Sequence, residues 1–280
     1  MYISNHIKIE ALKQKICVLG CGWLGFPLAK SLVKKEYLVK GSTTSVEKIK
    51  ALNSNGIEGF LVQLSSEGIT GDIEKCLSKC DTLVLNIPPG LRKNPEANYV
   101  KQMLLILPYV EVSSVKNVLF VSSTSIYDDH ELFPVISETS QTSTTSNVAQ
   151  QLVAVEELFT TNINFKTTVL RFSGLYGEDR HPAKFLSGRS NLKNPDAPIN
   201  LIHQSDCIAI IEKIIEQNAW NDFFNASSIT HPTKQTYYNS ICEAQNLPFP
   251  TFDNSQKSKG KIIDSSKLAR VLDYSFKIKL

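Results

Sequence analysis

The sequence contains no uninterrupted apolar run that reaches the roughly 18 residues of a membrane-spanning helix. Residues 1–14 also lack the long apolar core of a secretory signal peptide, and we expect them to form a polar N-terminal lead-in. Charge of one sign is scarce as well, because the net charge is only +3 and the basic residues are scattered along the chain. We therefore expect neither a nucleic-acid partner nor a membrane partner.

Metal-binding cysteine pairs are missing too. The six cysteines include no C-x-x-C pair, and Cys17 lies within an apolar run. Buried, reduced thiols are the preferred interpretation over a metal site, and they are typical of a cytoplasmic protein. The charged cluster at residues 128–131 lacks the spacing of a ligand set, so no metal site is predicted.

What the sequence does contain is a glycine-rich turn near its start. An apolar run that begins at Ile16 ends at Gly20, and Gly22 and Gly25 complete the pattern G-x-G-x-x-G before an amphipathic stretch. In this strand–turn–helix context Gly20 permits the tight turn, Gly22 lets a pyrophosphate approach the backbone and Gly25 lets the helix pack on the strand. The free N–H groups of the helix would hold the phosphates. The pattern predicts nucleotide binding, with a simple tight turn as the alternative.

The second expected strand ends without the acidic residue that usually selects NAD. Residues 40–45 contain no carboxylate and end in Thr43, Thr44 and Ser45. These hydroxyls, the N–H groups of the next helix and Lys48 are able to receive a 2′-phosphate. The residues also make a good helix cap, and both roles are compatible. NADP is therefore the preferred cofactor, with NAD as the alternative.

Strands and helices alternate along most of the chain. We expect helices over 46–53, 72–79, 96–112, 147–160 and 205–217, and strands over 16–19, 37–43, 59–64, 82–87, 117–121 and 223–224. This alternation predicts an α/β fold, a Rossmann-type doubly wound parallel sheet with a small C-terminal substrate lobe. We assign residues 15–171 to the NAD(P)-binding domain, and residues 172–280 to the remaining sheet elements and the lobe.

Several segments from about Lys15 onward resemble the extended short-chain dehydrogenase/reductase superfamily. These segments are the glycine motif, the Pro-Pro-Gly turn at 88–90, and residues 122–127, 170–177 and 200–206. Within the superfamily the chain is most similar to the atypical YeeZ-like branch of NAD-dependent epimerase/dehydratase-like proteins. The resemblance implies a set of further cofactor-binding residues, which are Trp23, Leu24, Asn86, Pro88, Pro89 and Ser122.

The proton relay of this superfamily is missing. Its members use a tyrosine whose pKa is lowered by a lysine four residues later, together with a serine that orients the reacting oxygen. Ser123 matches that serine. In the register set by residues 155–159, Val148 occupies the tyrosine position and Leu152 the lysine position. No other register restores the pair, since residues 117–165 contain no lysine or arginine and only one tyrosine, Tyr127.

Tyr127 and His203 are the remaining candidates for proton transfer. Tyr127 is close to Ser123 in sequence, although the superfamily uses the matching residue mainly for packing. His203 is a group that titrates near neutral pH, with the ordering of a helix cap as its alternative role. Tyr176 is a candidate for lining the substrate cleft, and packing is equally consistent with its position.

Two functions are consistent with these features. The first is an NAD(P)-binding oxidoreductase or epimerase/dehydratase-like enzyme with a substituted proton relay. It would act on a small, sugar-like or anionic substrate as a monomer or homodimer. The second is a non-catalytic protein that uses bound NADP(H) as a structural or sensing ligand. The first is preferred because the glycine motif and Ser123 are present, although function depends on the site and not on the fold.

Overall fold

The computed structural model describes residues 13–65, 67–91, 94 and 96–280. The expected N-terminal lead-in lies outside the described residues except for its last two positions.

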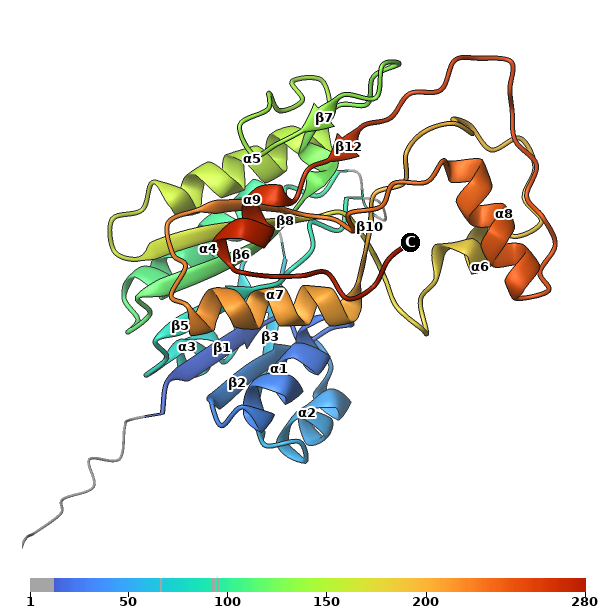
Figure 1. The fold of residues 1–280 in the computed structure, drawn as a ribbon. Coiled ribbons are helices and arrows are strands. Elements are labelled where there is room, and N and C mark those ends of the chain that lie inside the picture. Colours follow the sequence, from blue (N-terminus) through green and yellow to red (C-terminus); the bar gives the residue numbers. More distant parts are fainter. Residues whose placement is uncertain (1–12, 66, 92–93, 95) are drawn as a thin grey trace, which may run out of the picture.

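An eight-stranded sheet forms the centre of the molecule, with the strand order β11-β8-β6-β5-β1-β2-β3-β4 (Figure 1). Every pairing in it is parallel except the one between β3 and β4. The chain builds outward from β1 in one direction through β2 and β3, and in the other through β5 and β6. This reversal confirms the predicted doubly wound sheet. The strands are β1 (Lys15–Leu19), β2 (Leu38–Thr43), β3 (Ile57–Leu64), β4 (Ile69–Gly71), β5 (Thr82–Leu85), β6 (Asn117–Ser123), β8 (Lys166–Phe172) and β11 (Phe223–Ala226).

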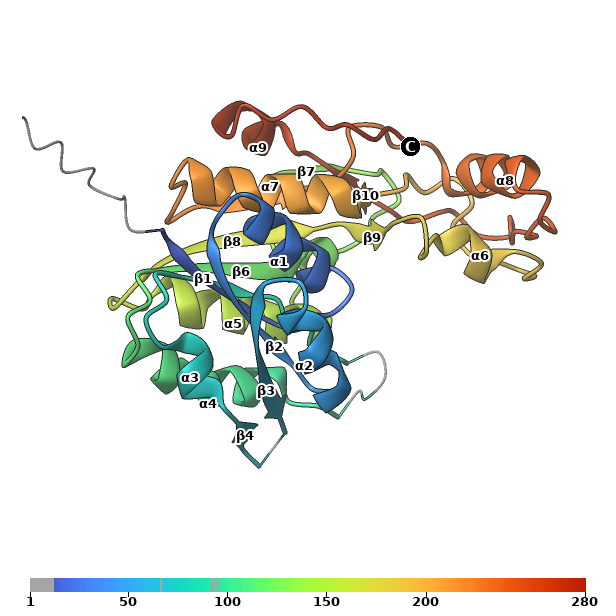
Figure 2. The same ribbon diagram turned by 90° about the horizontal axis from the view of Figure 1, so that it is seen from below.

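Helices cover both faces of the sheet, as Figure 2 shows. One layer contains α3 (Ile73–Leu77), α4 (Tyr99–Glu111) and α5 (Asn147–Thr160). The other contains α1 (Gly25–Lys34), α2 (Val46–Asn53), α7 (Gln204–Glu216) and α9 (Ser266–Val271). The predicted bounds of α2 and α5 match the structure at both ends, while the other predicted elements differ from it by one to three residues at one or both ends.

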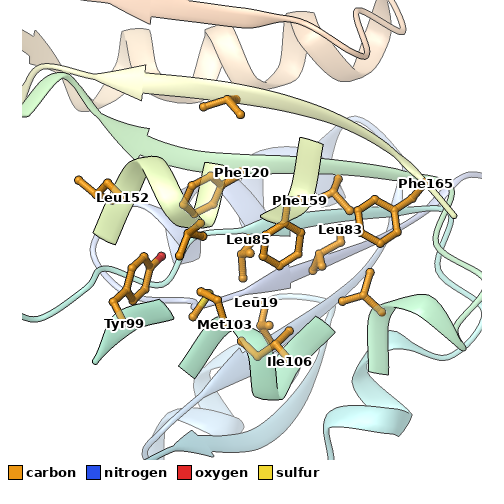
Figure 3. Packing of buried hydrophobic residues seen from close by; sticks show 14 of the residues in the cluster. Leu19, Leu83, Leu85, Tyr99, Met103, Ile106, Phe120, Leu152, Phe159 and Phe165 are labelled. Atoms are coloured by element: carbon orange, nitrogen blue, oxygen red, sulfur yellow. The ribbon is translucent and has the colours of Figure 1, made fainter. Parts of the chain in front are cut away.

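The central strands are apolar on both sides because each face carries helices. In β1, Cys17 and Leu19 point into the core under α3–α5, while Ile16 and Val18 point into the core under α1 and α7. This is the two-residue alternation of a strand. Figure 3 shows the first of these cores, where Phe120 and Phe159 stack at a centroid distance of 6.1 Å.

A smaller lobe extends from the carboxyl ends of the outer strands. It contains the strand pair β9 (Gly174–Tyr176) and β10 (Leu201–His203), and the helices α6 (Pro182–Leu186) and α8 (Lys234–Ala244). Its own apolar cluster is built around buried Tyr176, Tyr237 and Tyr238. The chain then returns to the main body, where β12 (Ile262–Ile263) pairs with β7 (Val135–Ile136) and α9 packs against β11. The lobe is therefore an excursion between sheet elements, and the C-terminal residues close the main core. Within the described residues, no helix is both long and apolar enough to cross a membrane.

Candidate functional site

A cleft of about 680 Å³ lies at the carboxyl ends of the central strands, where the strand order reverses. Its walls come from the β1–α1 turn, the end of β2, the loop after β5, the end of β6, α5 and the start of the lobe. Most of the predicted site residues line it: Gly20, Gly22, Trp23, Leu24, Thr43, Thr44, Lys48, Asn86, Pro88, Pro89, Ser122 and Ser123. Gly25, Ser45, Tyr127 and His203 are not among the lining residues.

The three motif glycines have different surroundings. Gly20 has a φ of +109°, and a Cβ atom there would lie 2.4 Å from the carbonyl oxygen of Asn86. A Cβ on Gly25 would lie 2.2 Å from the carbonyl oxygen of Gly20, so α1 can pack this closely on the end of β1 only because Gly25 has no side chain. A Cβ on Gly22 would meet nothing within 4 Å, and Gly22 lines the cleft. Protein atoms thus fill the space next to Gly20 and Gly25, whereas the space next to Gly22 is free for a ligand.

The start of α1 lies beside Gly22 at one end of the cleft. No side-chain hydrogen bond caps this helix. The residues just before it, Gly22, Trp23 and Leu24, line the cleft, so the positive end of the helix dipole lies at this end of it. The residues present therefore fit the pyrophosphate of a dinucleotide.

The end of β2 supplies the next part of the wall. The buried Ser42 hydroxyl accepts a 2.8 Å hydrogen bond from the Gly20 N–H and so ties β2 to the glycine turn. The Ser45 hydroxyl donates to the exposed Glu47 carboxylate, and this bond lowers the pKa of Glu47. Ser45 therefore serves the start of α2, whereas Thr44 and Lys48 face the cleft.

The end of β6 and the start of α5 form the opposite wall. Ser122 Oγ donates to Glu156 Oε1 at 2.6 Å, and Ser123 Oγ accepts from the N–H of Ser125 at 3.1 Å. Leu152, in the expected lysine position, lines the cleft with its apolar side chain. Among the described lining residues, only Lys48 and Cys21 carry an ionisable side chain, and burial raises the pKa of Cys21 to about 12.

Tyr127 belongs to a buried polar network behind this wall. Its hydroxyl accepts from Arg171 Nη1 at 2.6 Å and donates to Asn225 Oδ1 at 3.1 Å. Arg171 in turn pairs with Glu156, the closest N–O distance being 2.6 Å. Burial raises the pKa of Tyr127 despite the neighbouring guanidinium. The structure thus gives Tyr127 a packing and bridging role within the core, outside the cleft.

His203 lies at the start of α7. Its Nδ1 accepts a 3.2 Å hydrogen bond from the N–H of Ser205, and its ring meets Tyr176 edge-on at a centroid distance of 5.1 Å. The imidazole therefore caps the helix, which is the alternative role expected from sequence. Tyr176 is buried between His203 and His181, so its ring packs inside the lobe and does not line the cleft.

Two carboxylates of the charged cluster at 128–131 lie close to lysines of the C-terminal segment. Lys261 pairs with Asp129 at 2.8 Å, and Lys259 lies 3.9 Å from Glu131. In the part of the chain that the structure describes, no group of three or more histidine, cysteine or acidic side chains is arranged to hold a metal ion.

Sequence reasoning missed several apolar residues of the cleft. Leu175 and Phe172 close its lobe side, and Val62 and Leu64 close its β3 side. The sequence offered a signal for Val62 and Leu64: they are two residues apart at the carboxyl end of an expected strand, so their side chains share one face of the sheet.

Comparison with known proteins agrees with this architecture. No family model matches the chain. Protein YeeZ of Escherichia coli K12 is 28% identical over 267 residues, which cover 94% of this chain and 96% of YeeZ. A solved structure of a putative NAD-dependent epimerase/dehydratase from Methylobacillus flagellatus has a TM-score of 0.73 at 20% identity, covering 95% of this chain and 94% of that one. The UDP-glucuronic acid 4-epimerase of Bacillus cereus, solved in complex with NAD, has a TM-score of 0.78 at 17% identity, covering 95% and 93%. These similarities agree with the resemblance seen in the motifs: the chain is similar to YeeZ along nearly its whole length, and it has the fold of the solved NAD-dependent epimerase and dehydratase structures.

Proposed function

We propose that the chain binds NAD(P)(H) in this cleft. The observation that carries the proposal is the open position at Gly22, beside an uncapped helix terminus at the reversal of strand order. The glycine turn would hold the pyrophosphate, the loop at Pro88 and Pro89 would lie along the dinucleotide, and Ser122 and Ser123 would face its nicotinamide end. A bound nicotinamide supplies a hydride donor or acceptor.

NADP is the proposed cofactor, with NAD as the alternative. Thr44 and Lys48 line the cleft at the end of β2, and no carboxylate lies among the lining residues that the structure describes. A 2′-phosphate there would meet a hydroxyl and an ammonium group. The nearest negative charge in sequence is Glu47 on the first turn of α2, whose carboxylate accepts a hydrogen bond from Ser45.

The preferred activity is that of an oxidoreductase or epimerase-like enzyme. Ser123 would orient the reacting oxygen of a small substrate, which would enter between the sheet and the lobe. The Bacillus cereus epimerase has also been solved with UDP-glucuronic acid and NAD, which supports a sugar-like, anionic substrate. All six cysteines are buried free thiols, which supports a reducing compartment such as the cytoplasm.

A non-catalytic role is the second candidate, and one observation favours it. Tyr127 and His203 both have structural hydrogen-bond partners away from the cleft, and Leu152 replaces the relay lysine with an apolar wall. Such a site would bind NADP(H) as a structural or sensing ligand.

The decisive experiment measures binding and turnover separately. Calorimetric titration with NADPH and NADH should show binding to the wild type and a severe loss in Gly22→Val, whose circular dichroism should remain that of the folded protein. Equal affinity in both proteins would refute the dinucleotide site. Turnover of keto-sugars, aldehydes or ketones that is lost in Ser123→Ala would support the enzyme, whereas binding without any turnover would support the second candidate.

A further inference from the structure

The glycine-rich turn is connected directly to the lobe through Trp23. The indole N–H donates to Asp179 Oδ1 at 3.0 Å, and the Trp23 carbonyl oxygen accepts from Gln204 Nε2 at 2.7 Å. The ring lies so close to Gly177 that a Cβ there would be 2.9 Å from Trp23 Cζ2. Residues 177–180 of the lobe therefore rest on the part of the cleft that surrounds the proposed pyrophosphate position.

Arg180 is the cationic residue of this contact. Its guanidinium carbon lies 5.1 Å from the centre of the Trp23 ring, a cation–π arrangement. The backbone beneath it is a tight turn closed by two hydrogen bonds between Gly177 and Arg180, at 3.1 and 3.2 Å. The side chain is exposed, and it forms no ion pair with any residue that the structure describes. A long, flexible cation is thus held beside the cleft with its charge uncompensated by a salt bridge.

The glycine turn itself supplies only partial charges to a ligand. Lys48 is the one cationic side chain among the described lining residues, and it lies at the end of β2, where the adenosine ribose is expected. A pyrophosphate beside Gly22 would carry two negative charges, and helix N–H groups would neutralise them only in part. Arginine is well suited to the remainder, since its planar fork binds phosphate oxygens in pairs.

We infer that Arg180 is an anion-binding residue of the dinucleotide site, contributed by the lobe and positioned by the ring of Trp23. This inference rests on the proposed function and adds to it, because it makes the lobe part of the cofactor site. Asp179 fixes the indole through its hydrogen bond. Its negative carboxylate repels the pyrophosphate, so its effect on ligand binding is opposite to that of Arg180.

The test is calorimetric titration of the full-length protein with ADP-ribose, NADPH and adenosine at about 0.05 M and about 0.5 M salt. Arg180→Gln should weaken ADP-ribose and NADPH binding about tenfold at low salt and less at high salt, while adenosine affinity stays unchanged. Asp179→Asn keeps an acceptor for the indole N–H and removes a negative charge, so it should bind both phosphate ligands more tightly. Arg189→Gln, which removes an exposed arginine of the same lobe, is the matched control and should behave as the wild type.

These outcomes separate the two proposals. Absence of both NADPH and ADP-ribose binding in the wild type would refute the proposed function itself. Normal binding in the wild type, with Arg180→Gln equal to Arg189→Gln, would overturn only the role of Arg180. Weaker binding in Asp179→Asn would also contradict it, since a purely structural contact predicts loss in both variants. The inference is supported only if Arg180→Gln weakens the binding of the phosphate ligands and Asp179→Asn strengthens it.

Discussion

Replacing glycine by alanine should lower the stability of the protein at Gly25, but should weaken only ligand binding at Gly22. In Gly25→Ala the new Cβ would lie 2.2 Å from the carbonyl oxygen of Gly20 and 2.9 Å from Asn86 Nδ2. The nearer atom belongs to the backbone of the turn, so the clash cannot be relieved by rotating a side chain. In Gly22→Ala the new Cβ would meet no protein atom within 4 Å.

The magnitudes follow from these surroundings. Overpacking typically costs about 1–3 kcal/mol, and a backbone clash this short places Gly25→Ala near the upper end, at about 3 kcal/mol. For a domain of this size that loss lowers the melting temperature by about 6–12 °C. Gly22→Ala should change the free energy of unfolding by less than about 0.5 kcal/mol, yet weaken NADPH binding on the order of tenfold, because the methyl group occupies space that the pyrophosphate needs.

Differential scanning calorimetry and NADPH titration of both variants test this prediction. Gly25→Ala should melt early, and Gly22→Ala should melt with the wild type while binding poorly. The reasoning would be refuted by a Gly25→Ala protein as stable as the wild type, or by a Gly22→Ala protein that binds NADPH with full affinity.

Three further predictions concern cofactor choice, the buried network and pH. Thr44→Asp should reverse a preference for NADPH over NADH, since a carboxylate at this exposed position repels a 2′-phosphate by about 1 kcal/mol, roughly tenfold in affinity. Titration at two salt concentrations checks it, and tighter NADH binding by the wild type would contradict it. Glu156→Gln should cost about 3–5 kcal/mol in urea unfolding because it leaves the buried Arg171 charge unpaired, whereas Glu157→Gln on the exposed face of the same helix should cost almost nothing; similar midpoints for the two would refute this. Burial lowers the pKa of His231, so its contribution to stability is present above about pH 6.5 and is lost as the pH falls through the folded-state pKa. Between about pH 8 and about pH 5 the free energy of unfolding should therefore decline less steeply for His231→Gln than for the wild type. Parallel pH curves for the two proteins would contradict this role of His231.

Much of the main fold followed from local patterns in the sequence. Short apolar runs marked the central strands, and the expected bounds of α2 and α5 agree with the structure. Both kinds of element are recognised from a few neighbouring residues, because backbone geometry repeats over that length. The tight turn expected at Gly20 and the close packing expected at Gly25 agree with their surroundings for the same reason, because a strand–turn–helix unit is completed within one short segment.

Side-chain roles depended on residues far away in the chain. Tyr127 is only four positions from Ser123 in sequence, but its hydroxyl is bonded to Asn225, 98 positions away, and thus lies in the core. Trp23 and Asp179 are 156 positions apart, and only the folding of the lobe onto the glycine turn brings Arg180 beside the cleft. Local sequence determined most of the elements around β1 and the place of the glycine-rich turn. Tertiary structure decided which polar groups face the cleft, because a buried donor or acceptor must find its partner wherever the packing places one.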